Sequence, residues 1–146
     1  MGLDNAIEIR RKDNLPNCAL CFEENWHKKY GYDLEVAYWR KCWNVRAIIF
    51  DVLRRGDDND SIIDITREEL VEIIHRLEDD LHYFDFLEEE WGSCIWEWNT
   101  FRSIQKWNLK RLKKLAHMMK RHPKLKLSST TVTDKKRTVH AVLFTL

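Results

Sequence analysis

The stretch that decides the fold is WEWNTFRSIQKWNLKRLKKLAHMMKRH, residues 96–122. It contains no glycine or proline, and its large apolar residues return every three or four positions, which predicts one long α-helix. A basic end followed by Pro123 predicts that this helix ends near His122. Its predicted inward side comprises Phe101, Ile104, Asn108, Leu112, Leu115 and Met119, with Trp107 beside them.

The other side of this helix is basic. Its predicted cations are Arg102, Lys106, Lys110, Lys113 and Arg121, together with His117. Residues 99–133 include ten basic and no acidic residues. Such a side, with Trp107 close to it, suits contact with a phosphate backbone combined with ring stacking. One hypothesis is therefore a nucleic-acid-binding protein that uses this helix.

The segment before it predicts a second helix, which is acidic. Thr66 and Glu69 form a capping-box pattern, so a helix is expected to start there. Three glutamates at positions 88–90 oppose the helix dipole and predict an end before or at that run. The expected apolar face comprises Leu70, Ile73, Ile74, Leu77, Leu81 and Phe84.

The charges of the two segments oppose each other, although the formal net charge of the chain is only +1. Residues 57–90 contain 14 acidic and two basic residues. We expect the acidic and basic segments to lie near each other and to neutralise each other in part. The alternative is a dipolar molecule, with a basic face toward nucleic acid or an acidic partner and an acidic face that imitates an anionic molecule. Such an acidic face would inhibit a host protein.

Residues 33–56 predict a further helix, with Asp33 as its N-cap and Gly56 after its C-terminus. Beyond these helices, alternation at residues 125–127 and β-branched residues at 138–145 predict a small C-terminal β-hairpin, with a short strand at residues 6–10 as a candidate third strand. The expected fold is one domain over residues 1–146, of the α+β class but mainly α, with three or four helices packed on that hairpin.

No catalytic pattern is present. The sequence lacks a glycine-rich phosphate loop, and none of its six histidines pairs with a cysteine or serine in a nucleophilic arrangement. Cys18 and Cys21 have the spacing of half a zinc site, without the other half. We therefore expect a protein that is not an enzyme and has no metal or cofactor. No apolar run approaches the length of a membrane span, and we expect a cytoplasmic protein.

The best candidate ligand site joins aromatic rings and cations in residues 38–46. Its members are Tyr38, Trp39, Arg40, Trp43 and Arg46. If this segment is helical, Trp43 has a cation three residues away on either side. Guanidinium groups beside indole rings can hold a planar anion such as a nucleotide. The alternative is that the two tryptophans belong to the core and Arg40 to the solvated surface.

The same residues carry a resemblance. Residues 38–41, YWRK, preceded by DLEV, resemble a motif of small uncharacterised proteins of tailed bacteriophages. That family continues as YWRKxNxIHxWF, whereas this chain has Trp43 at the asparagine and Arg46 at the histidine. Residues 66–70 and the break at Trp91, Gly92 and Ser93 are also similar. The resemblance implies a viral origin and no known activity.

These observations lead to one main expectation. We expect a phage-encoded, non-enzymatic binding protein that acts in the cytoplasm of an infected bacterial host, in counter-defence or host takeover. Its expected partner is an anionic small molecule such as a nucleotide signal, with a host protein or nucleic acid as alternatives. An apolar stripe in excess of one small core would form a homodimer.

Overall fold

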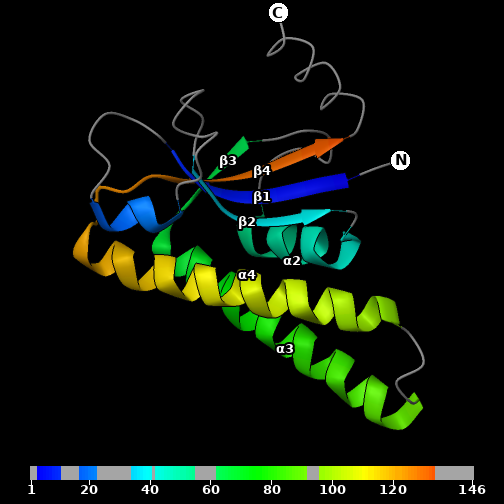
Figure 1. Cartoon of the computed structure of the whole chain (residues 1–146). Helices are drawn as coiled ribbons and strands as arrows, with labels where there is room; N and C mark the ends of the chain where they lie inside the picture. The colour runs from blue at the N-terminus through cyan, green and yellow to red at the C-terminus, as the bar shows by residue number, and fades with distance from the viewer. Residues whose placement is uncertain are drawn as a thin grey trace, which may run out of the picture.

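The computed structural model describes residues 3–10, 17–22, 34–40, 42–54, 62–91 and 96–133. Within them a β-sheet forms one layer, and the helices α2, α3 and α4 form a second layer that covers one face of the sheet (Figure 1). In chain order the elements are β1 (Leu3–Ile9), the 3-10 helix η1 (Asn17–Phe22), β2 (Leu34–Arg40), α2 (Trp43–Leu53), β3 (Ile62–Ile65), α3 (Arg67–Trp91), α4 (Trp96–Arg121) and β4 (Leu127–Thr133).

The sheet is antiparallel, has four strands in the order β2-β1-β4-β3, and is larger than the predicted hairpin. The α+β class is thus confirmed, but the prediction of a small C-terminal hairpin is wrong. β4 pairs over its whole length with β1, so the sheet joins the two ends of the described chain. The second predicted hairpin strand, residues 138–145, lies outside the described residues.

The prediction of one helix over residues 33–56 is also wrong, because residues 34–40 form the strand β2. The pairing of β2 with β1 shifts register, so that Ile7 faces Ala37 and Glu8 faces Glu35. Val36 is the extra residue of this β-bulge. Val36 and Ala37 are both buried although they are adjacent, which interrupts the alternation that is typical of a strand.

The rest of that segment is helical. α2 begins at Trp43 and ends at Leu53. Arg54 follows in the left-handed conformation with a φ of 51°, and its backbone N–H donates to the carbonyl of Phe50 at 2.8 Å. A left-handed residue after the last helical turn is a common C-terminal cap. Arg54 therefore ends the helix two residues before Gly56, the predicted end.

The two long helices agree with the sequence. α4 spans Trp96–Arg121, as predicted to within one residue. α3 starts at the predicted capping box, in which the Glu69 N–H donates to Thr66 Oγ1 at 3.2 Å and the Thr66 N–H donates to Glu69 Oε1 at 3.0 Å. α3 ends at Trp91, after the glutamate run that was expected to stop it. The helix dipole is thus too weak a force to end this helix early.

The core lies between the sheet and the three helices. Its largest fully buried side chains are Trp39, Ile7, Ile9, Leu34, Ile49, Leu70, Ile73, Leu77, Leu112, Leu115 and Leu127. They come from β1, β2, α2, α3, α4 and β4, so each of these elements contributes apolar area to the same cluster. Burying such side chains is the main favourable term in folding.

The capping box offers a first test. We expect Thr66→Ala to lower the free energy of unfolding by about 0.5–2 kcal/mol, because the N–H of Glu69 loses its acceptor. Urea unfolding followed by circular dichroism measures this change. Thr66→Ser keeps the hydroxyl and should unfold close to the wild type. Equal midpoints for the alanine variant and the wild type would contradict the capping role.

Candidate functional site

The five residues of the predicted ligand site do not share a face. Tyr38, Trp39 and Arg40 lie on β2, and Trp43 and Arg46 lie on α2. Successive residues of a strand point to opposite faces of the sheet. Trp39 is fully buried on the helix-covered side, whereas the hydroxyl of Tyr38 donates to Asp4 Oδ1 at 2.7 Å. The expectation of one helical group of rings and cations is therefore wrong.

Trp39 is a core residue. Its indole N–H donates to Oε1 of the buried Gln105 on α4 at 2.6 Å. Trp43, in contrast, is 57% exposed, and the guanidinium carbon of Arg46 lies 5.5 Å from the centre of its ring. The alternative interpretation thus holds for Trp39. Of the predicted ring and cation pairs, the structure brings Trp43 and Arg46 into contact on α2.

α4 runs along the outer edge of β2 and satisfies the backbone of this edge strand. The buried Asn108 side chain donates to the Tyr38 carbonyl at 2.9 Å and accepts from the Tyr38 N–H at 3.4 Å. Arg111 Nε donates to the Val36 carbonyl at 2.6 Å, and its Nη2 donates to the Glu35 carbonyl at 3.1 Å. Covering the backbone of an edge strand prevents its pairing with another chain.

The Arg111 guanidinium also lies close to two rings. Its carbon is 4.4 Å from the centre of the Trp107 ring and 5.0 Å from that of Phe22 on η1. Trp107 remains 53% exposed and Ile104 43% exposed. Both were expected on or beside the inward side of the helix, so this part of the prediction is wrong. Trp107 instead forms a surface ring whose inner side packs on Arg111.

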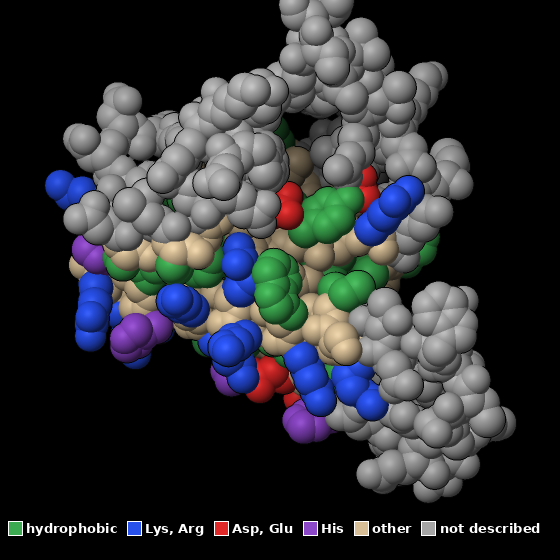
Figure 2. Space-filling model, viewed as in Figure 1, with side chains coloured by type: hydrophobic (Ala, Val, Ile, Leu, Met, Phe, Trp, Pro, Cys, Tyr) green, Lys and Arg blue, Asp and Glu red, His purple; other side chains and the backbone are tan. Residues whose placement is uncertain are grey.

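The basic side of α4 faces solvent over most of its length. Lys106, Lys110, Lys113 and Arg121 are exposed as predicted, whereas Arg102 is half-buried. Lys114 is a further exposed cation, which the predicted set omitted. At 3.6 residues per turn, these five exposed cations lie within about 100° of one another around the helix axis. Figure 2 shows Lys and Arg side chains following this helix, with apolar side chains between them.

Several acidic residues of segment 57–90 form ion pairs or hydrogen bonds with other residues of the chain. Glu78 of α3 pairs with Lys113 of α4 at 3.1 Å, so the two helices neutralise each other here as expected. Asp64 pairs with Arg10 at 2.8 Å, and Asp80 accepts a hydrogen bond from Asn44 at 2.7 Å. Acidic residues 57, 58 and 60 lie outside the described residues. Glu78, Asp64 and Asp80 thus contact three different parts of the structure, and part of the acidic charge is neutralised within the molecule.

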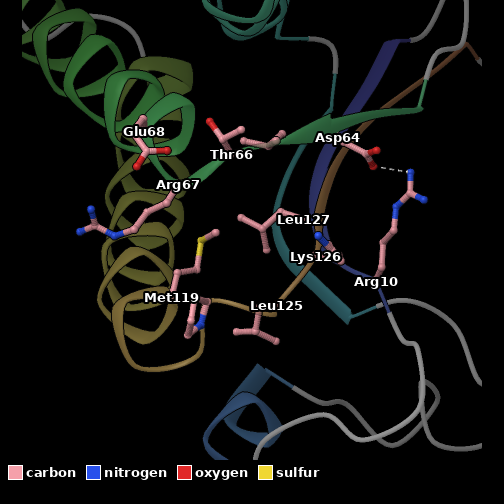
Figure 3. Close-up of a pocket in the computed structure, with 11 residues that line it drawn as sticks. Arg10, Asp64, Thr66, Arg67, Glu68, Met119, Leu125, Lys126 and Leu127 are labelled. Atoms are coloured by element: carbon pink, nitrogen blue, oxygen red, sulfur yellow. Dashed lines mark ion pairs between the residues drawn. The ribbon is translucent and has the colours of Figure 1, made fainter.

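Two hollows are present in the described surface. The larger, about 540 Å³, lies at the start of α3 (Figure 3). Arg10 and Asp64 stand on one side of it, Arg67 and Glu68 on the other, and apolar side chains between them. The smaller, about 350 Å³, lies between α3 and α4, and its lining includes Lys106, Lys110 and Lys113. The smaller hollow therefore adjoins the basic side of α4, although Glu78 of α3 also lines it, and charges of both signs surround the larger one.

The described cysteines are free thiols in different surroundings. The Cys42 thiol donates to the Arg40 carbonyl at 3.3 Å, and burial raises its pKa above the ordinary value, so it stays protonated at neutral pH. Cys18 and Cys21 are exposed free thiols. Within the described residues no three His, Cys, Asp or Glu side chains gather closely enough to hold a metal ion. None of the described helices combines the length and apolar character that a membrane span requires.

Comparison with known proteins adds no relative. No protein-family model matches the chain, and neither a curated protein nor a solved structure gives a significant match. The site must therefore be judged by its own geometry. By that measure, the strongest candidate is the solvent side of α4, where cations and an exposed indole ring lie side by side.

Proposed function

We propose that this protein binds nucleic acid through the solvent side of α4 and is not an enzyme. One observation carries the proposal: the exposed side of α4 from Lys106 to Arg121 bears cations, no acidic residue and a half-exposed tryptophan. Cations that replace the counterions of phosphates supply most of the affinity of non-specific nucleic-acid binding. Aromatic rings add stacking to the bases.

The spacing of the cations supports this proposal. Lys106, Lys110 and Lys114 follow one another at intervals of four residues, or about 6 Å along the helix axis. Residues 106–121 extend the row to about 22 Å. None of these three lysines has an ion-pair partner within the described part of the chain. They are thus available to phosphate groups along several nucleotides.

The acidic helix α3 is compatible with such a partner. Glu78 faces α4 and is paired with Lys113. The exposed acids Glu72 and Asp79 lie about 100–120° around the α3 axis from Glu78, away from the contact with α4. A strand on the outer side of α4 would therefore meet the lysines before these carboxylates. The same contacts give less support to an inhibitor that binds a host protein through its acidic face.

A second candidate is a small anionic ligand, such as a nucleotide, at Trp43 and Arg46. It is favoured by the stacking of Arg46 on an exposed indole ring. Phe50 also faces this guanidinium, at 5.1 Å. Arg46 has further contacts of its own. This pair is a smaller group than the five residues that the sequence predicted, so the ligand version ranks second.

The resemblance to phage proteins suggests the biological context in which such binding would act. We propose a role in counter-defence or host takeover in an infected bacterium, where either a nucleic acid or a nucleotide signal is a suitable target. Homodimer formation belongs to the same proposal, and sedimentation of the purified chain tests it.

Salt dependence tests the nucleic-acid proposal directly. With about four phosphates contacted on a single strand, the logarithm of the affinity should fall with the logarithm of salt concentration at a slope of about −3. Fluorescence anisotropy of a labelled 20-nucleotide strand between 50 and 200 mM salt measures this slope. No binding at the lowest salt by a folded sample would refute the proposal.

A further inference from the structure

We propose that the partner is single-stranded and that one unpaired base stacks on the outer side of Trp107; this inference rests on the proposed nucleic-acid binding. The starting point is the fixed position of the ring. One side of the indole packs on the Arg111 guanidinium, whose carbon is 4.4 Å from the ring centre. The ring nonetheless keeps 53% of its surface exposed. It is therefore held in place and still accessible.

Arg111 is itself immobilised. Its Nε donates to the Val36 carbonyl at 2.6 Å and its Nη2 to the Glu35 carbonyl at 3.1 Å. The guanidinium carbon also lies 5.0 Å from the centre of the buried Phe22 ring. The Arg111 guanidinium, on which Trp107 packs, is thus held by two hydrogen bonds to β2 and by the Phe22 ring. A ring that is already ordered loses little conformational entropy when a ligand stacks on it.

The surroundings of the ring suit a nucleotide. Lys114 lies about 20° and Lys110 about 60° around the α4 axis from Trp107, each one or two turns further along. Both are exposed and lie C-terminal to Trp107, so the phosphates of a strand that continues in that direction from a stacked base would meet cations. Ile104, one turn before Trp107, adds an exposed apolar contact. A base, its sugar and its phosphates each find a matching group.

This arrangement favours single strands over duplexes. The bases of a duplex are already stacked on their neighbours, and presenting one to a protein ring costs a few kcal/mol of unstacking. An unpaired base offers its face without that cost, and stacking on an aromatic side chain strengthens binding by about 1–3 kcal/mol per base. Against a duplex, Trp107 would meet only the sugar-phosphate backbone. The exposed ring therefore contributes affinity chiefly to a single strand.

The experiment compares variants of one ring on two probes. A labelled oligothymidylate of 12 nucleotides and a 12-base-pair duplex are titrated at 50 mM salt by anisotropy. Trp107→Leu keeps an apolar side chain over Arg111 but removes the stacking ring, and Trp107→Phe keeps a ring. Tyr83→Ala is the matched control, because Tyr83 is also an exposed aromatic side chain, with 59% of its surface accessible, and it lies on α3 rather than on the solvent side of α4. Circular dichroism confirms that each variant is folded.

We expect the wild type to prefer the single strand by at least about tenfold. Trp107→Leu should weaken single-strand binding by about 5- to 150-fold, which is the measured range for one stacked base. It should leave duplex binding unchanged, while Trp107→Phe and Tyr83→Ala stay near the wild type. Equal binding of both probes, insensitive to Trp107→Leu, would overturn the stacking inference and leave the proposed function standing. No binding of either probe would overturn both.

Discussion

Replacing Trp39 by alanine is expected to lower the free energy of unfolding by about 3–5 kcal/mol, one of the largest losses that a single core substitution causes. The side chain is fully buried between the sheet and α4. Its removal leaves a cavity and also deprives the buried Oε1 of Gln105 of its 2.6 Å donor. Urea unfolding monitored by circular dichroism measures the loss.

Trp43→Ala provides the contrast, because the two tryptophans are four residues apart and only one is in the core. With 57% of its surface exposed, Trp43 should contribute less than about 1 kcal/mol to stability. The same variant tests the second candidate function, since it should abolish nucleotide binding if the ligand stacks there. A Trp39→Ala protein as stable as the wild type would refute the assignment of Trp39 to the core.

The sequence predicted α3 and α4 well because the signals for these helices are local. The capping box of Thr66 and Glu69 involves residues three apart, and it forms as expected. Pro123 follows the last turn of α4 and restricts the residue before it. Each helix also has a long apolar side, so its periodicity is averaged over many residues. No distant contact is needed to recognise either helix.

β2 could not be predicted in the same way, because its strand character depends on pairing with β1. The bulge at Val36 places Val36 and Ala37 on the buried side together. This breaks the alternation that identifies a strand. β4 was missed over most of its length for a different reason. Its residues LSSTTVT contain two serines, Ser128 and Ser129, which are buried only because the sheet surrounds them.

The residues of the candidate site show the same difference between local and long-range signals. The exposed lysines of α4 followed from helical spacing, since the side opposite an apolar stripe faces solvent. The outward position of Trp107 did not follow, because it depends on Arg111, which contacts β2 more than 70 residues away in the sequence. Asn108 gave a partial signal, as a polar residue on the predicted inward side. Such a residue requires a buried partner, and here the partner is the backbone of β2.

Reversing three charges on α4 should have the largest effect on binding. We expect Lys106→Glu/Lys110→Glu/Lys114→Glu to weaken single-strand affinity by about 100-fold or more, or about 2.7 kcal/mol. Three counterion-releasing contacts are lost, and three carboxylates now repel the phosphates. The salt slope of the remaining binding should also become shallower. Anisotropy titrations at 50–200 mM salt measure both quantities.

The control must separate a local contact from the effect of net charge. Arg40→Glu/Arg54→Glu/Lys124→Glu changes the net charge by the same amount at exposed positions outside α4. This variant should lose far less affinity, because exposed charges that do not contact the bound strand are screened by salt. Glutamates on α4 also face the acids of α3, so a triple Lys→Gln variant at positions 106, 110 and 114 guards against misfolding and should lose about tenfold. If the two triple reversals weaken binding equally, the affinity comes from overall charge, and the solvent side of α4 is not the binding surface.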